Sequence, residues 1–262
     1  MPSDRDVFRD FLESPLERPR QVKLAVIVAR EIANDIFARG LVPGDALPNE
    51  AEMLKGLEVS RATLRESLRV LETQGVIAMR TGRGGGPVVA QPSPRALADT
   101  LTVNLRSLGV TFEEILFTRD TIEPALARQA ALNRDDDDLD RLREAARSLE
   151  DAGWDSTDTL QLNRQFHSAV AMASRNRPLA IMWAAISTVA DGQEVGATID
   201  ERLWSAGNAA HAKIVVAIED ADPDRAERAM SVHVDAFHHE MASAHPQLLE
   251  ASVRSTGAEA RR

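Results

Sequence analysis

The helical spacing of apolar residues through the second part of the chain, residues 98–250, constrains this sequence most strongly. Segment after segment repeats apolar side chains every three or four residues, which is the period of an amphipathic helix. No alternating pattern typical of strands competes with it. We therefore expect an antiparallel α-helical bundle. The expected helices cover residues 96–108, 111–132, 138–151, 157–174, 178–191, 209–221 and 224–244, and residues 192–208 are ambiguous.

The charge of the chain is unevenly divided. Residues 98–250 carry 14 basic and 27 acidic side chains, whereas residues 21–90 carry 9 and 8. The net charge of −10 does not exclude nucleic-acid binding, because such a protein needs only one positive face. Prolines in the run Gln91-Pro92-Ser93-Pro94 interrupt helix and strand alike. We expect an N-terminal extension at 1–20, domains at 21–90 and 98–250, a linker at 91–97 and a tail at 251–262.

The composition narrows the class of protein. Cysteine is absent from the 262 residues, which excludes disulfides, thiolate metal sites and cysteine nucleophiles. Hydrophobic residues make up 44% of the chain and charged residues 27%, as in a folded globular protein. The sequence has neither an apolar run of about 18 residues nor a basic and apolar leader. We therefore expect a mostly α-helical cytoplasmic protein without a membrane partner.

The first domain begins with the pattern of a helix-turn-helix. Apolar residues at helical spacing predict a helix over residues 24–37. Asn49 and Glu52 have the spacing of a capping box and open a short second helix. The hydroxyl group of Ser60 can cap a third helix that runs to about Gly75. Two short helices joined by a tight turn are typical of a helix-turn-helix motif.

The third helix has two different faces. Arg61, Arg65 and Arg69 lie four residues apart, so their guanidinium groups share one face, while Leu64 and Leu68 lie on the other. The apolar face can pack, which leaves the arginines free to pair with guanine edges or phosphates of DNA. The alternative is a solvated arginine face balanced by acidic residues of the same helix. The helix alone leaves both interpretations open.

A hairpin is expected directly after this helix. Residues 76–80 and 88–90 have strand-like composition and flank a glycine-rich turn at 81–87. A helix-turn-helix followed by a hairpin is a winged helix, in which Arg80 and Arg83 reach the phosphate backbone or the minor groove. A nucleotide-binding loop is disfavoured, because no Lys-Ser/Thr pair follows the glycines and no helix opens behind them.

The run from Gly44 to Val89 resembles the winged-helix domain of GntR-type transcription regulators in residue types and spacing. The matching segments are Leu47-Pro48-Asn49-Glu50, Val59-Ser60-Arg61, Leu64-Arg65-Glu66-Ser67-Leu68, Leu71 and Gly75-Val76-Ile77. The resemblance implies contacts with a double-stranded DNA operator by Ser60, Arg61, Thr63, Arg65 and the wing residue Gly82. Ala51 stands where family members often carry arginine, so the operator sequence is not carried over.

Three histidines in the second domain have a spacing that suits a metal site. His167 lies one helical turn after Asn163, and His211 and His233 lie on two later helices. Three helices can aim three imidazoles inward, and one oxygen ligand would complete a divalent site of zinc, nickel or manganese type with an open position. The alternative is that each histidine is a surface or packed residue. The latter interpretation is adopted for His238, His239 and His245.

Several segments of the second domain resemble the FCD ligand-binding domain of the fatty-acid-regulator-like branch of GntR proteins. They are Arg119-Asp120-Thr121-Ile122-Glu123, Asn163-Arg164-Gln165-Phe166-His167, Ser174-Arg175-Asn176 and the segment from His211 to His233. The resemblance implies a metal on an aspartate and three histidines, with a small carboxylate effector beside it. Asn163 stands where aspartate is usual, so Asp120 is an alternative carboxylate ligand. Arg119 matches the family's effector-binding arginine, and its alternative role is an ion pair with Glu123.

These observations favour a transcription regulator, with repression as the expected action. A homodimer would read a pseudo-palindromic operator, and a small organic acid would modulate DNA binding through the metal-containing domain. One alternative is a metal-dependent enzyme that uses the histidines, but the sequence has neither a convincing general base beside them nor a nucleophile motif, so no enzymatic activity is expected. The other alternative is a regulator whose metal is purely structural.

Overall fold

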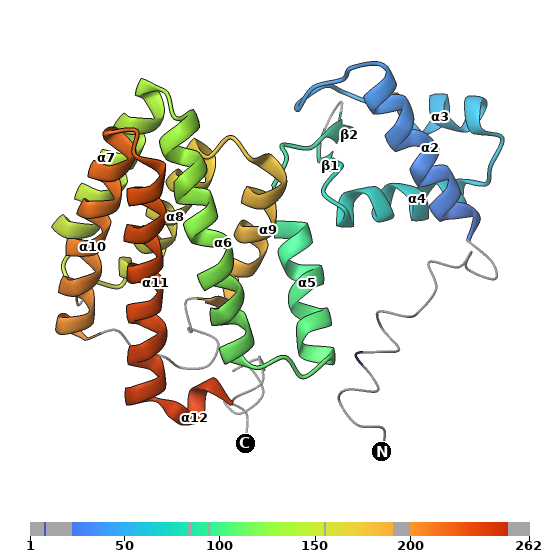
Figure 1. Cartoon of the computed structure of the whole chain (residues 1–262). Coiled ribbons are helices and arrows are strands. Elements are labelled where there is room, and N and C mark those ends of the chain that lie inside the picture. The colour runs from blue at the N-terminus through green and yellow to red at the C-terminus, as the bar shows by residue number, and fades with distance from the viewer. Residues whose placement is uncertain are drawn as a thin grey trace. The chain divides into compact units, whose positions relative to one another are not determined.

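The computed structural model of the chain describes residues 23–82, 85–93, 95–154, 156–190 and 200–250, together with Phe8. The chain forms two compact units, Met1–Leu97 and Ala98–Arg262 (Figure 1). Three sequence-based expectations fall outside the described residues: the extension at 1–20 apart from Phe8, the tail at 251–262 and the wing residue Arg83.

The first unit is a winged helix-turn-helix, as the sequence predicts. Its elements are α2 (Leu24–Ala38), α3 (Glu50–Leu57), α4 (Arg61–Thr73), β1 (Ile77–Arg80) and β2 (Gly86–Val89). The two strands pair antiparallel, with Ile77 opposite Val89 and Arg80 opposite Gly86. The strands therefore form the ribbon of a wing directly after α4.

Side-chain caps determine where α3 and α4 begin. Asn49 Oδ1 accepts a hydrogen bond from the Glu52 backbone at 3.1 Å, and Glu52 Oε2 accepts one from the Asn49 backbone at 2.9 Å. This pair is a capping box, which satisfies amide groups that have no partner within the helix. Ser60 Oγ accepts from the Thr63 backbone at 3.1 Å and caps α4 in the same way.

Helix α4 has one buried face and one exposed face. Leu64 and Leu71 are fully buried and pack in one cluster with Ile36 of α2 and Ile77 of β1. The exposed face carries Arg61, Arg65 and Arg69. Packing of the leucines thus fixes α4 on the unit and leaves its arginine face open to solvent.

The second unit is an all-α bundle, as the sequence predicts. Its helices are α5 (Arg95–Ser107), α6 (Phe112–Asn133), α7 (Asp136–Ala152), α8 (Thr159–Ala173), α9 (Arg177–Ala190), α10 (Glu201–Glu219), α11 (Pro223–Ala244) and α12 (Pro246–Leu249). Helix α11 packs against α6 and α10, and α7 packs against α8 (Figure 1). Among the described residues, no helix combines the length and apolar character needed to cross a membrane.

The main core of the second unit brings α8, α10 and α11 together. Phe166 of α8, Ile214 of α10 and Met230 of α11 are fully buried members of one cluster. Phe166 directly precedes His167, Ile214 lies three residues after His211, and Met230 lies three residues before the third histidine. Because residues three apart share a helix face, the packing that buries Ile214 and Met230 also turns His211 and His233 inward.

Among the helix boundaries, the start of α10 differs most from expectation. Helix α10 begins at Glu201 instead of residue 209, and the Asp200 side chain accepts a hydrogen bond from the Leu203 backbone at its start. Gly207 weakens the helical pattern there, but packing outweighs its cost of about 1 kcal/mol. Helix α5 begins at Arg95, so residues 95–97 of the expected linker are helical.

Truncating a side chain on the buried face of α4 should change the free energy of unfolding much more than truncating one on the exposed face. We expect Leu64→Ala to reduce the free energy of unfolding of the first unit by about 2–5 kcal/mol, because it leaves a cavity in the core. Arg69→Ala on the exposed face should change it by less than about 0.5 kcal/mol. Urea unfolding followed by circular dichroism measures both. Equal stability of the two variants would contradict the packing of α4.

Candidate metal centre and DNA-binding face

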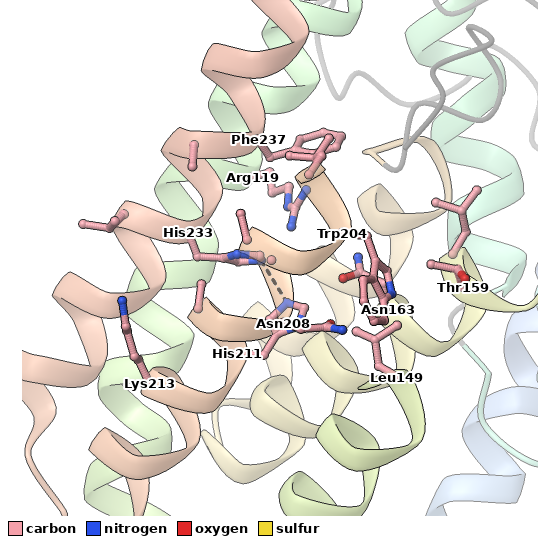
Figure 2. Close-up of a pocket in the computed structure, with 17 residues that line it drawn as sticks. Arg119, Leu149, Thr159, Asn163, Trp204, Asn208, His211, Lys213, His233 and Phe237 are labelled. Atoms are coloured by element: carbon pink, nitrogen blue, oxygen red, sulfur yellow. Dashed lines mark hydrogen bonds between the residues drawn. The ribbon is translucent and has the colours of Figure 1, made fainter. Parts of the chain in front are cut away.

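Three buried histidines from three helices meet in the second unit. His167 of α8, His211 of α10 and His233 of α11 are only 3%, 3% and 8% exposed. The Nε2 atom of His233 lies 3.1 Å from that of His211 and 3.3 Å from that of His167. Figure 2 shows His211 and His233 pointing toward each other beside a cavity. The structure therefore gathers three imidazole nitrogens at one point, within 4.8 Å of one another.

The protonation state of this cluster suits a metal ligand. Burial lowers the pKa of His211 and His233 well below the ordinary value for histidine, and the neighbouring His167 and Arg119 lower it further. Both rings are therefore neutral at neutral pH, which is the form that binds metal ions. Three ring nitrogens that face one another fit the donor set of a first-row divalent ion.

Glu123 of α6 is a site residue that the sequence identified only as an ion-pair partner of Arg119. It is 2% exposed, and its two carboxylate oxygens contact different partners: Oε1 contacts Arg119 Nε, and Oε2 contacts His167 Nδ1. Burial alone would raise the pKa of Glu123, but Arg119 and His167 hold it well below the ordinary range. A carboxylate at Nδ1 fixes the ring orientation of a histidine whose Nε2 is left to bind a metal.

Arg119 lies between the histidines and the cavity. Its guanidinium group is 7% exposed, with Nη2 3.3 Å from His167 Nε2 and Cζ 5.1 Å from the centre of the Phe237 ring. The ion pair with Glu123 that the sequence offered as its alternative role is present. The side chain also lines the cavity. Arg119 is therefore placed both at the ion pair with Glu123 and at the cavity wall.

The cavity beside the cluster has a volume of about 210 Å³. Its walls include His211 and His233, mostly apolar side chains, and the polar groups of Trp204, Asn208 and the exposed Lys213 (Figure 2). A smaller cavity of about 20 Å³ adjoins His167 and Glu123, and Arg119 lines both. Trp204 and Asn208 were not predicted, because they lie in the segment whose pattern was ambiguous.

The two oxygen ligands expected from the sequence are placed differently. Asn163 lies one turn before His167 and lines both cavities. Asp120 is not part of the histidine cluster, because its Oδ2 lies 2.6 Å from His238 Nδ1. Consecutive helical residues point about 100° apart, so Asp120 and Arg119 point in different directions. The Asp120 carboxylate contacts His238, and its role as an alternative ligand stays a prediction.

The expected DNA-contacting residues lie at α4 and the wing. Arg61, Arg65 and Arg69 are exposed, and the Ser60 and Thr63 hydroxyls lie 2.8 Å apart at the start of α4. Arg65 Nε donates to Glu50 Oε1 at 3.1 Å, which holds this guanidinium against α3. Arg80 is exposed at the end of β1, and Gly82 has a φ of +99°, a conformation that favours glycine.

Two family patterns match the sequence. The pattern of the bacterial regulatory proteins of the gntR family matches residues 24–85, and that of the FCD domain matches residues 114–236. The first match covers the helix-turn-helix and β1. The second covers Arg119, Glu123 and all three clustered histidines.

Known proteins are similar to this chain across both units. The Exu regulon transcriptional regulator of Escherichia coli (strain K12) is 31% identical over 232 residues, covering 84% of each chain. The HTH-type transcriptional repressor NanR of Cronobacter sakazakii is 28% identical over 241 residues, covering 87% of this chain and 88% of that one. A solved structure of Streptococcus agalactiae GntR has a TM-score of 0.64 at 26% identity, covering 82% of this chain and 99% of that one.

The Glu123 contacts predict a large effect of neutralising this side chain. We expect Glu123→Gln to lower the free energy of unfolding of the second unit by about 3–5 kcal/mol, because it leaves the buried Arg119 guanidinium without its counter-ion. Glu227→Gln, at the solvent-accessible ion pair with Arg128, should cost less than about 1 kcal/mol. Thermal and urea unfolding compare the two variants. Similar losses would contradict a special role of the buried carboxylate.

Proposed function

Because the chain belongs to the GntR family of bacterial transcription regulators and contains an FCD domain, we propose that it is a homodimeric repressor controlled by a divalent metal and a small organic acid. DNA binding and transcription regulation follow from the family. The alternative of a metal-dependent enzyme is not supported, since the related proteins are transcription regulators. A relative that is named a repressor supports repression as the action of this chain.

The observation that carries the metal proposal is the convergence of three buried imidazoles on one point. His167, His211 and His233 would hold the ion, and the Glu123 carboxylate orients the first of these rings. A zinc-, nickel- or manganese-type ion bound there would act as a Lewis acid toward an oxygen of an anionic ligand. Imidazole ligands add no negative charge, so the ion would keep its full positive charge. Asn163, one turn from His167, is the nearby oxygen donor that the sequence offers.

The adjoining cavity supports a small carboxylate as the effector. Arg119 offers a buried guanidinium group to it, and Lys213 adds a positive charge at an exposed position of its wall. A guanidinium group pairs with a carboxylate through two parallel hydrogen bonds. The remaining walls are largely apolar, which suits a compact organic acid.

The arginine face of α4 and the wing support operator binding. Arg61, Arg65 and Arg69 are placed to meet base edges or phosphates, with Arg80 at the wing. Two copies related by a two-fold axis would present two such faces to a pseudo-palindromic operator. An effector changes this binding only if it prefers one arrangement of the dimer.

The DNA-reading assignment predicts the effect of single arginine changes. We expect Arg61→Ala and Arg65→Ala each to weaken binding to DNA from upstream of the protein's own gene by about 1–3 kcal/mol. Each lost phosphate contact should also reduce the slope of log affinity against log salt by about 1. Fluorescence anisotropy at two salt concentrations measures both quantities.

Arg147→Ala is the matched control, because it removes the same charge from an exposed position of α7. This variant should bind the DNA as the wild type does. Unchanged affinity and salt slope in Arg65→Ala would show that the arginine face is solvated surface.

The metal assignment predicts stabilisation by added ion. Zinc at 100 times its dissociation constant should add about 2.7 kcal/mol to the stability of the second unit. His211→Ala and His233→Ala should abolish the rise in thermal midpoint, whereas the exposed control His239→Ala should retain it. A panel of organic acids added to the metal-loaded protein on DNA then separates two roles. If the metal stabilises the protein but none of the acids changes DNA affinity, the metal is structural.

A further inference from the structure

The contact between Arg119 and His167 has a defined direction. Arginine has no hydrogen-bond acceptor, so Nη2 of Arg119 donates and Nε2 of His167 accepts, across 3.3 Å. The other ring nitrogen, Nδ1, contacts the Glu123 carboxylate, which can only accept, and therefore carries a proton. The free lone pair of His167 consequently points toward a guanidinium group.

A metal ion at the cluster needs the same lone pair. Nε2 is the atom of His167 that faces His233, and it is the atom through which this ring joins the cluster. One lone pair cannot hold a guanidinium proton and a metal ion together. The Arg119 guanidinium cation would also repel a metal cation bound to the same nitrogen, and this repulsion is strong in a buried site.

We propose that Arg119 competes with the metal ion for His167 Nε2, and that a small anion taken up by the guanidinium group releases this nitrogen to the metal. This inference rests on the metal site proposed above, and it adds a coupling between metal binding and anion binding. Anion and metal then bind cooperatively, and each raises the affinity of the other by the same factor.

The surroundings of Arg119 suit such an exchange. Its Nε atom is held by Glu123, while the guanidinium group also borders the 210 Å³ cavity and lies over the Phe237 ring. The guanidinium group is planar and turns as one unit, so a rotation of the side chain carries its Nη end away from His167 and toward the cavity. A carboxylate in the cavity offers charge-assisted bidentate hydrogen bonds, which are stronger than the single long bond to a neutral nitrogen.

Zinc titration of Arg119 variants tests the competition. Arg119→Lys retains the positive charge but cannot contact Glu123 and His167 together, and Arg119→Met removes charge and donor alike. In chloride buffer, isothermal titration calorimetry should show that both bind Zn²⁺ about tenfold more tightly than the wild type. The control Arg147→Ala removes an exposed cation of α7 that does not line the cavity, and it should leave the affinity nearly unchanged.

Acetate serves as the anion probe. Replacing chloride with acetate at constant ionic strength should tighten Zn²⁺ binding to the wild type and leave Arg119→Met unchanged. If acetate tightens both equally, it acts as a metal ligand, and release through Arg119 is wrong.

A measurement on the unaltered protein covers the case in which a variant fails to fold. Long-range ¹H–¹⁵N spectra should show the Arg119 guanidinium resonances shifting when Zn²⁺ is added, together with those of His167. Guanidinium resonances that stay unchanged while the His167 ring shifts would overturn the competition.

The outcomes distinguish the competition by Arg119 from the metal site on which it rests. Zn²⁺ binding by the wild type, with equal or weaker binding by folded Arg119 variants, overturns the competition and leaves the proposed metal site intact. Absence of Zn²⁺ binding from the wild type and from every variant overturns the metal site, and the competition with it.

Discussion

The buried carboxylate of Glu123 is the interaction on which the arrangement of the site depends. One oxygen holds Arg119 and the other holds His167, so a single side chain of α6 orients a cation and an imidazole ring of α8. A lone charge in this environment would be strongly unfavourable, and its two partners offset the loss of hydration. Without this carboxylate, the guanidinium group would be a buried charge without its counter-ion beside three imidazole rings.

Local features of the fold could be predicted from the sequence, whereas contacts between helices could not. The capping box at Asn49 is confirmed, because both of its partners lie within one helical turn. Convergence of the histidines could be expected from their positions on separate helices. The contact of Glu123 with His167 depends on how α6 packs against α8. In the sequence, Glu123 is marked only as a charged residue on a largely apolar face of α6.

Neighbouring residues of α6 show how a helix divides its side chains between different surroundings. Arg119 faces the histidine cluster, while Asp120 pairs with His238 of α11. The FCD resemblance made both of them candidates for the same site, but the angular separation of consecutive helical residues gives them different partners. The clustered atoms are three imidazole nitrogens, with the buried Arg119 and Glu123 pair beside them.

The long α10 helix divides two tasks along its length. Its first two turns contribute Trp204 and Asn208 to the cavity wall, and the next turn contributes His211 to the cluster. Substitutions in the early turns alter the shape and polarity of the wall while the histidine stays in place. The cavity wall can therefore change between descendants of a common ancestor without disturbing the nitrogen cluster, because the two features lie on different turns of one helix.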